Sequence, residues 1–524
     1  MRHSGGSPRT YRRLVGGRRR RWASVAPLAL LVAGLAVVTT ACLPVTGPGP
    51  GTGGPTPTPT PIPTPTPPAP GPVADLSHPL TGGNGPFIAE STPVDLNQAG
   101  YTQAEYAASG TATSYQAAGS LGGDGRWTLT PNGTAQYKSR IIVRRPAAAT
   151  KFSGNVLVEW LNVSSGIDID PEWASLSEEL TRRGDIWVGV SAQRIGIEGG
   201  PVLVPTPGAS GLAGKGLKTI DPARYGSLTH PGDGFSFDIY TQITRALRTG
   251  AALDGLRPQK VIAAGESQSA FALTTYYNGV QPLTRAFDAF FVHSRGAAGL
   301  PLVGAGQNAD LAGAIFNSPA TFRTDQSAPV LDVQTETDLT GLLNSAKARQ
   351  PDSDRFRLWE VPGTAHADAH LIGPTASSFD CGVPINNGPM HLVVKAAWRA
   401  LITWVTAGHA PATAPRIALS QSGSSTSVTR DADGIALGGI RTPPVDVPVD
   451  VLSGEPGPTQ STVCLLLGST KPLPAARLAA LYPSRADYES RYATSAAATI
   501  AAGYVLSEDR PALLAYSQPD RVSG

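Results

Sequence analysis

The sequence is poor in charged and aromatic residues and contains almost no cysteine or methionine. Of its 524 residues, 15% are charged and 6% are aromatic, with three Cys and two Met, whereas 41% are hydrophobic. This balance excludes a disordered chain and a coiled coil, both of which need more charge. It also excludes a polytopic membrane protein, and it leaves enough apolar side chain for a large core.

Acidic residues are absent from the first 41 positions, where eight of the 42 Lys and Arg residues lie. The rest of the chain has 34 basic and 39 acidic residues, a formal charge of −5. A slightly acidic body gives no reason to expect nucleic acid or an anionic membrane surface as a partner. We therefore assign the basic run to targeting.

The N-terminus has the organisation of a signal peptide, with an arginine-rich stretch, nineteen uncharged residues over 23–41, and then Cys42. The small residues before Cys42 resemble a bacterial lipobox, with Thr39 in place of the usual leucine. We predict that residues 1–41 are removed and that Cys42 is lipidated. The alternatives are an uncleaved membrane anchor and a plain secretory signal. Arg12-Arg13 also resembles a twin-arginine signal, so the export route stays open.

Residues 42–76 form a linker rich in proline and threonine. From Pro44 to Pro72, 13 of 29 residues are proline. A polyproline-like backbone is expected, reaching about 90 Å at roughly 3.1 Å per residue. Such a spacer fits between a lipid anchor and a folded body, and the alternative is a ligand for a proline-recognition domain.

Two cysteines, Cys381 and Cys464, remain once Cys42 is set aside. An even pair in an exported protein predicts one disulfide, which would tie the region after the last predicted strand to the C-terminal segment. The alternative is two buried free thiols.

Residues 77–410 alternate short apolar, β-branched runs with longer amphipathic stretches, which predicts an α/β fold with a mostly parallel central sheet. Strands are expected at 110–115, 137–144, 155–161, 185–191, 260–264, 289–292, 330–334 and 357–361, and helices at 173–183, 235–252 and 270–277. Residues 194–233, rich in glycine and proline, predict a lid-like insertion. Residues 411–524 predict an extension that packs on the same domain.

The pattern Gly265-Glu266-Ser267-Gln268-Ser269 lies between an apolar strand and a helix, the setting of a nucleophile elbow. In such a turn the serine hydroxyl is exposed above the sheet, while small neighbours avoid clashes. Ser269 replaces the usual glycine, so the match is partial. We predict Ser267 as the nucleophile, and the alternative is an ordinary helix N-cap serine.

The base and the acid of such a site follow the nucleophile, at the ends of the last two strands. His366 lies just past the final strand and is the predicted base for Ser267. Asp338, in the loop after the preceding strand, is the predicted acid. Glu336 in the same loop is the alternative, because either carboxylate could hold the histidine tautomer.

The oxyanion of an acyl-transfer reaction needs two backbone donors. One is expected to be the N–H of Gln268, directly after the nucleophile. The other should come from the loop 162–166, after the strand at 155–161, and we assign it to Val163.

The motifs resemble those of the alpha/beta hydrolase domain family of secreted bacterial and fungal serine hydrolases. The stretches that carry the resemblance are Gly265-Glu266-Ser267-Gln268-Ser269, Thr335-Glu336-Thr337-Asp338, Gly363-Thr364-Ala365-His366-Ala367-Asp368 and residues 224–233. It extends from about residue 77 to the C-terminus. The resemblance implies the α/β-hydrolase fold and a carboxylic-ester hydrolase activity, without identifying a substrate.

We therefore predict an exported serine hydrolase that cleaves small or polymeric esters through an acyl-enzyme, without a metal or organic cofactor. The sequence leaves two other classes of protein as alternatives. His366, Asp368 and His370 alternate as metal ligands can, which would indicate a metallohydrolase, but no second His or Cys cluster completes the site. A non-catalytic surface lipoprotein of the same fold is the other alternative. His370 and His391 are the fallback bases if His366 is not the base.

Overall fold

The computed structural model describes residues 67–89, 94–206 and 211–523. The predicted signal peptide, Cys42 and most of the linker lie outside these residues, so their assignments stay predictions. Within the described ranges, no helix combines the length and the apolarity needed to cross a bilayer.

The described residues form one large sheet in the order β1-β2-β3-β5-β4-β6-β7-β8-β9. Its strands are β1 (Asp75–Pro79), β2 (Tyr101–Ala117), β3 (Leu129–Pro146), β4 (Asn155–Trp160), β5 (Ile186–Val190), β6 (Lys260–Glu266), β7 (Ala289–His293), β8 (Val330–Thr335) and β9 (Phe356–Val361). Pairing is antiparallel from β1 to β5 and parallel from β5 to β9. The predicted α/β class with a mostly parallel sheet is therefore confirmed.

The parallel strands are apolar along their length because helices cover both faces of this part of the sheet. Every residue of β4, β7 and β8 is buried, and β6 is exposed in part only at Lys260. At the other edge, β2 and β3 form a long hairpin in which Gly110 pairs with Tyr137. The antiparallel neighbour predicted for the strand at 137–144 is thus confirmed.

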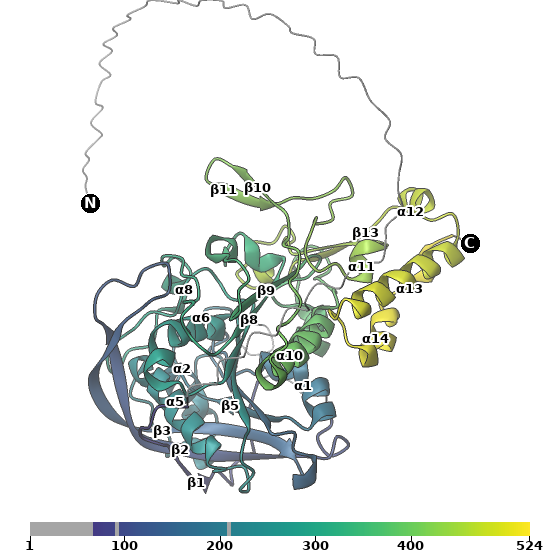
Figure 1. Ribbon diagram of the computed structural model, residues 1–524. Helices are drawn as coiled ribbons and strands as arrows, with labels where there is room; N and C mark the ends of the chain where they lie inside the picture. Colours follow the sequence, from purple (N-terminus) through teal and green to yellow (C-terminus); the bar gives the residue numbers. More distant parts are fainter. Residues whose placement is uncertain (1–66, 90–93, 207–210, 524) are drawn as a thin grey trace, which may run out of the picture. The chain divides into compact units, whose positions relative to one another are not determined.

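Two helical layers cover the sheet (Figure 1). One contains α1 (Pro171–Arg183) and α10 (Met390–Ala407), and the other contains α5 (Ser236–Arg248) and α6 (Gln268–Thr275). Each layer has its own apolar core, with Trp398 in the first and Phe237 in the second. The helix α10 was not expected from the sequence, and α5 ends four residues before the predicted boundary at Ala252.

Shorter elements connect these layers. The insertion over 194–233 carries α2 (Arg194–Glu198), α3 (Gly216–Ile220) and α4 (Pro222–Tyr225). The other short helices before α10 are α7 (Gln281–Thr284), α8 (Leu311–Ala314) and α9 (Ala369–Ile372).

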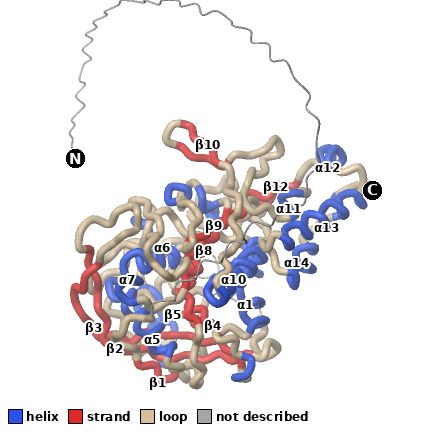
Figure 2. The backbone as a smooth tube through the Cα atoms, viewed as in Figure 1, coloured by secondary structure: helices blue, strands red, loops and turns tan. Residues whose placement is uncertain are grey.

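The region after α10 contains two antiparallel strand pairs and four α-helices, and its helices are labelled in Figure 2. These elements are β10 (Leu419–Ser422), β11 (Ser425–Val428), α11 (Pro443–Asp446), β12 (Asp450–Ser453), β13 (Ser469–Pro472), α12 (Ala475–Leu481), α13 (Arg485–Ala501) and α14 (Arg510–Ala515). Ala496, Val505 and Leu513 join the same apolar core as α1 and α10. This region therefore adds to the core that covers one face of the sheet.

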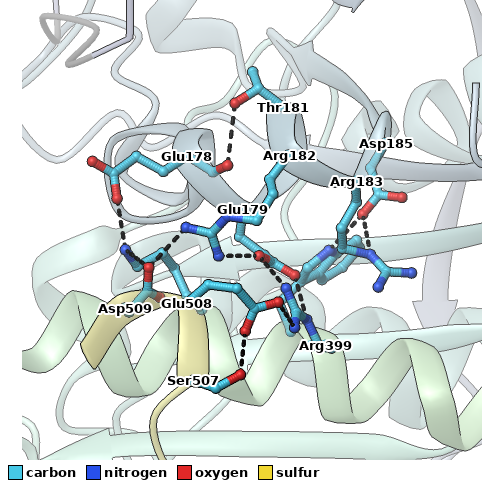
Figure 3. Close-up of polar contacts among 12 residues, drawn as sticks. Glu178, Glu179, Thr181, Arg182, Arg183, Asp185, Arg399, Ser507, Glu508 and Asp509 are labelled. Atoms are coloured by element: carbon cyan, nitrogen blue, oxygen red, sulfur yellow. Dashed lines mark hydrogen bonds and ion pairs between the residues drawn. The ribbon is translucent and has the colours of Figure 1, made fainter. Parts of the chain in front are cut away.

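A network of ion pairs reinforces this contact (Figure 3). Arg182 of α1 pairs with Asp509 at 2.7 Å, and Arg399 of α10 bridges Glu179 and Glu508 at 2.7 and 2.6 Å. Because both carboxylates at 508 and 509 precede α14, the network fixes the start of that helix against α1 and α10.

Candidate active site

The turn between β6 and α6 places Ser267 at its apex. Ser267 has φ 59° and ψ −120°, a conformation that costs energy for a residue with a Cβ and is typical of a nucleophile elbow. A Cβ on Gly265 would come within 2.9 Å of the Cβ of Ser269, so the position has no room for a larger residue. Gly265 thus allows α6 to pass close to β6 while the hydroxyl of Ser267 is presented above the sheet.

His366 follows β9 and contacts both the serine and a carboxylate. Its Nε2 lies 2.7 Å from Oγ of Ser267, and its Nδ1 lies 2.7 Å from Oδ1 of Asp338. Asp338 is fully buried, and its second oxygen accepts the backbone N–H of Thr335. The structure therefore brings Ser267, His366 and Asp338 into one hydrogen-bonded chain, in the geometry of a Ser-His-Asp triad.

Glu336, the alternative acid, takes part in a different set of contacts. One carboxylate oxygen accepts the N–H of Gly363, and the other contacts Arg430 at 2.6 Å and the N–H of Gly454 at 2.9 Å. Glu336 therefore ties the β8–β9 loops to the C-terminal region, and it is Asp338 that lies against the imidazole.

A second carboxylate, that of Glu266, also lies beside the imidazole. Its Oε1 is 3.4 Å from Nε2 of His366. Burial alone would lower the pKa of His366, but the charges of Glu266 and Asp338, with the Asp338 hydrogen bond, outweigh burial and raise this pKa above its ordinary value. Glu266 belongs to the elbow motif, but the motif predicts no role for it.

The side chain of Gln268 links the two predicted oxyanion donors. As the first residue of α6, Gln268 has a backbone N–H without an acceptor inside the helix. The N–H of Val163 donates to Oε1 of Gln268 at 3.2 Å, and Nε2 of Gln268 donates to Oε1 of Gln193. The loop after β4 is thus held against the start of α6. A substrate oxyanion that accepts the N–H of Val163 would have to replace the Gln268 side chain as its acceptor.

Above Ser267 lies a cavity of about 500 Å³. Its wall comes from the loops 87–89 and 162–171, from Val204, Thr206 and Leu212 of the insertion, and from residues 366–379 and 463–467. Of the 24 described residues that line it, 16 are apolar, and Glu266 and His366 are the two with ionisable side chains. This volume is within the range of small-molecule sites.

The predicted disulfide is present. Cys381 and Cys464 are bonded, with their Cα atoms 5.5 Å apart. Both belong to a small apolar cluster that includes Ile372 and Phe379, two residues of the cavity wall. The disulfide therefore joins two segments that form one side of the cavity.

The three residues of the metal hypothesis lie in different settings. His366 contacts Ser267 and Asp338, Asp368 caps α9 through the N–H of Leu371, and the ring of His370 stacks on His391 at 3.6 Å. The part of the chain that the structure describes contains no group of three His, Cys, Asp or Glu side chains that could hold a metal. His370 and His391, the alternative candidates for the catalytic base, thus stack on each other, and it is His366 that contacts Ser267.

A buried acid–imidazole pair behind the site was not predicted from the sequence. Nδ1 of His293, at the end of β7, lies 3.6 Å from Oε2 of Glu172, at the start of α1. Burial lowers the pKa of His293 to about 4 and raises that of Glu172 well above its ordinary value. His293 is therefore expected to be uncharged near neutral pH, and burial favours the protonated form of Glu172. A histidine at the end of a predicted strand was the available signal, but its partner is over a hundred residues away in the sequence.

A family model described as "Alpha/beta hydrolase domain" matches residues 69–515. A search of curated proteins gives no match. Similar solved structures include an a/b serine hydrolase without lid from Xanthomonas campestris, with 13% identity over 49% of this chain and 85% of that chain and a TM-score of 0.25.

Two further structures are similar at the same level. A putative dienelactone hydrolase from Klebsiella pneumoniae is 12% identical over 56% of this chain and 98% of that one, with a TM-score of 0.27. A thermostable esterase from Pseudomonas putida is 14% identical over 61% and 86%, with a TM-score of 0.29. Likenesses this weak add nothing to the family match.

Proposed function

The chain belongs to the alpha/beta hydrolase domain family, and from this premise we propose that it is an exported serine hydrolase that cleaves carboxylic esters. The observation that carries the proposal is the pair of 2.7 Å contacts that His366 makes with Ser267 and Asp338, below an open apolar cavity. Neither the metal hypothesis nor the binding-protein hypothesis explains why a serine at positive φ faces a paired histidine.

The first half-reaction forms an acyl-enzyme. Oγ of Ser267 attacks the ester carbonyl carbon while Nε2 of His366 takes its proton, and Asp338 stabilises the resulting imidazolium. The tetrahedral oxyanion accepts the N–H of Gln268 and, once the Gln268 side chain has moved away from it, that of Val163. When the intermediate collapses, His366 returns the proton to the leaving alcohol and the acyl group stays on Ser267.

The second half-reaction reverses these roles with water. His366 takes a proton from a water molecule, whose oxygen attacks the acyl carbon of the Ser267 ester. Collapse of the second tetrahedral intermediate releases the carboxylic acid, and the proton returns from His366 to Oγ. Each step uses groups of this chain and water alone.

A fluorophosphonate probe followed by peptide mapping tests the activity. We expect covalent labelling at Ser267 that is lost in His366→Ala, together with hydrolysis of a simple ester that is lost in Ser267→Ala. Absence of labelling in a sample with native circular dichroism, or full esterase activity in Ser267→Ala, would overturn the proposal.

Export and anchoring form a separate part of the proposal and rest on the N-terminal sequence. In a bacterial host, we expect the protein in the membrane fraction with incorporated fatty acid, and Cys42→Ala to lose the fatty acid. Fatty-acid-free protein in the wild-type culture medium would favour the plain secretory signal, and an intact N-terminus in the membrane would favour the anchor.

A further inference from the structure

The cavity above Ser267 has an unusual charge balance for a site that must bind a polar ester group. Its described lining contains the carboxyl group of Glu266 and the imidazole of His366 but no lysine or arginine. Glu266 is nearly buried, with 5% of its side chain exposed, and it lies within 3.4 Å of the base. The described lining thus places an acidic group beside the reacting atoms. It contains no lysine or arginine that could pair with a second carboxylate, brought by a substrate.

The arginines that contact the loop 167–171 do not change this balance. Arg140 and Arg144 are each paired with a carboxylate of that loop. Arg140 contacts Glu105 and Asp168 at 2.7 Å, with its side chain fully buried. Arg144 contacts Asp170 at 2.5 Å, with 3% of its side chain exposed. Their charges are used to hold the loop in place.

The rest of the lining is mostly aliphatic. Ile167, Ile169 and Pro171 line the cavity from the loop after β4, and Leu371, Ile372 and Leu467 line it from the segments near the disulfide. A surface of this kind stabilises methylene and methyl groups, whereas a buried carboxylate would lose its hydration without a partner.

We infer that the enzyme selects uncharged esters with an aliphatic acyl group and rejects esters whose acyl group ends in a carboxylate. The inference rests on the proposed function and names its substrate class. Rejection has two causes: repulsion by Glu266, which lines the same cavity, and desolvation of the carboxylate among aliphatic side chains. Among neutral esters, each methylene of the acyl chain that is buried in the cavity stabilises the bound ester. We therefore expect kcat/KM to rise about fourfold per added methylene until the cavity is filled.

Two esters of equal shape test the charge term. One is 4-nitrophenyl 5-methylhexanoate, whose acyl chain ends in an isopropyl group. The other is the 4-nitrophenyl monoester of glutaric acid, whose acyl chain ends in a carboxylate. We expect kcat/KM of the purified full chain to favour the neutral ester by about 100-fold or more. A ratio near one would overturn the inference.

A variant assigns the effect to its residue. Glu266→Gln keeps the shape of the side chain and should reduce the ratio by about tenfold, because repulsion is removed while the desolvation cost remains. Glu508→Gln, at a residue outside the cavity, removes the same charge and should leave the ratio unchanged. An equal ratio in wild type and Glu266→Gln would overturn the role of Glu266.

Labelling in the same samples separates the two levels of the proposal. If fluorophosphonate labels Ser267 and both esters are hydrolysed at equal rates, the inferred substrate class is wrong and the proposed function stands. Absence of labelling and of hydrolysis removes the proposed function and the substrate class with it.

Discussion

Oε1 of Glu266 lies 3.4 Å from Nε2 of His366, the same ring nitrogen that contacts Oγ of Ser267. The imidazolium formed during acyl transfer would therefore have a carboxylate on each side, Glu266 near Nε2 and Asp338 at Nδ1. Such an arrangement favours the protonated form of His366 and links turnover to pH.

The first prediction concerns the acidic limb of the pH–rate profile. Turnover requires neutral His366, whose pKa is raised by Glu266 and Asp338. As the pH is lowered, kcat/KM should therefore fall with a midpoint above the ordinary histidine pKa of 6.5. Glu266→Gln removes one stabilising charge and lowers this pKa, so the limb should move to lower pH. Glu508→Gln serves as the control for net charge, and a limb that moves to higher pH in Glu266→Gln would contradict the assignment.

The second prediction separates the two acids of the β8–β9 loops. Asp338→Asn should lower kcat by about 10⁴-fold, because an amide does not stabilise the imidazolium and favours the wrong tautomer. Glu336→Gln should leave kcat/KM within about threefold but lower the free energy of unfolding by about 2 kcal/mol, since Arg430 loses the closer of its two carboxylate partners. Steady-state kinetics and urea unfolding on both variants measure these effects. The reverse pattern would make Glu336 the acid.

The sequence predicted the centre of this fold well because the parallel strands are buried on both faces. The predicted runs at 260–264, 289–292 and 330–334 fall inside β6, β7 and β8. The candidate nucleophile, acid and base then follow from strand order, because the ends of parallel strands meet at one edge of the sheet.

The remaining features depend on contacts that no local pattern records. Glu336 and Asp338 are two residues apart, and the difference between them comes from Arg430 in the C-terminal region, which binds Glu336. The hydrogen bond from Val163 to the side chain of Gln268 also joins distant segments. The helix α10 is mostly buried and rich in apolar residues, so it lacks the polar face that marks a surface helix.

The third prediction concerns stability at acid pH. The pKa of His293 is about 4 in the folded protein against 6.5 when exposed, chiefly because of burial. As pH falls from 6.5 to 4, the unfolded state gains a proton that the folded state does not, and about 3 kcal/mol of stability is lost. His293→Asn removes this contribution. The free energy of unfolding of the wild type minus that of the variant should therefore fall by about 3 kcal/mol between pH 7 and 4.

Equilibrium urea unfolding at several pH values measures this difference. Asp368, whose pKa burial raises to about 6, acts in the opposite direction, because the folded state gains its proton first. That contribution is common to both proteins and largely cancels in the comparison. A difference that stays constant across the range would mean that His293 is not buried in its neutral form.

The fourth prediction concerns the disulfide and the cavity wall. The bond between Cys381 and Cys464 closes a loop with a sequence separation of 83 residues, so Cys381→Ser with Cys464→Ser should lower the free energy of unfolding by about 2–4 kcal/mol. Because Ile372, Phe379 and Leu467 pack around the bond while Ser267 and Asp338 lie on other segments, KM for an aliphatic ester should rise more than kcat falls. Reductant should produce the same change in the wild type and none in the double variant. If kcat falls with KM unchanged, the disulfide supports the triad and the wall assignment is wrong.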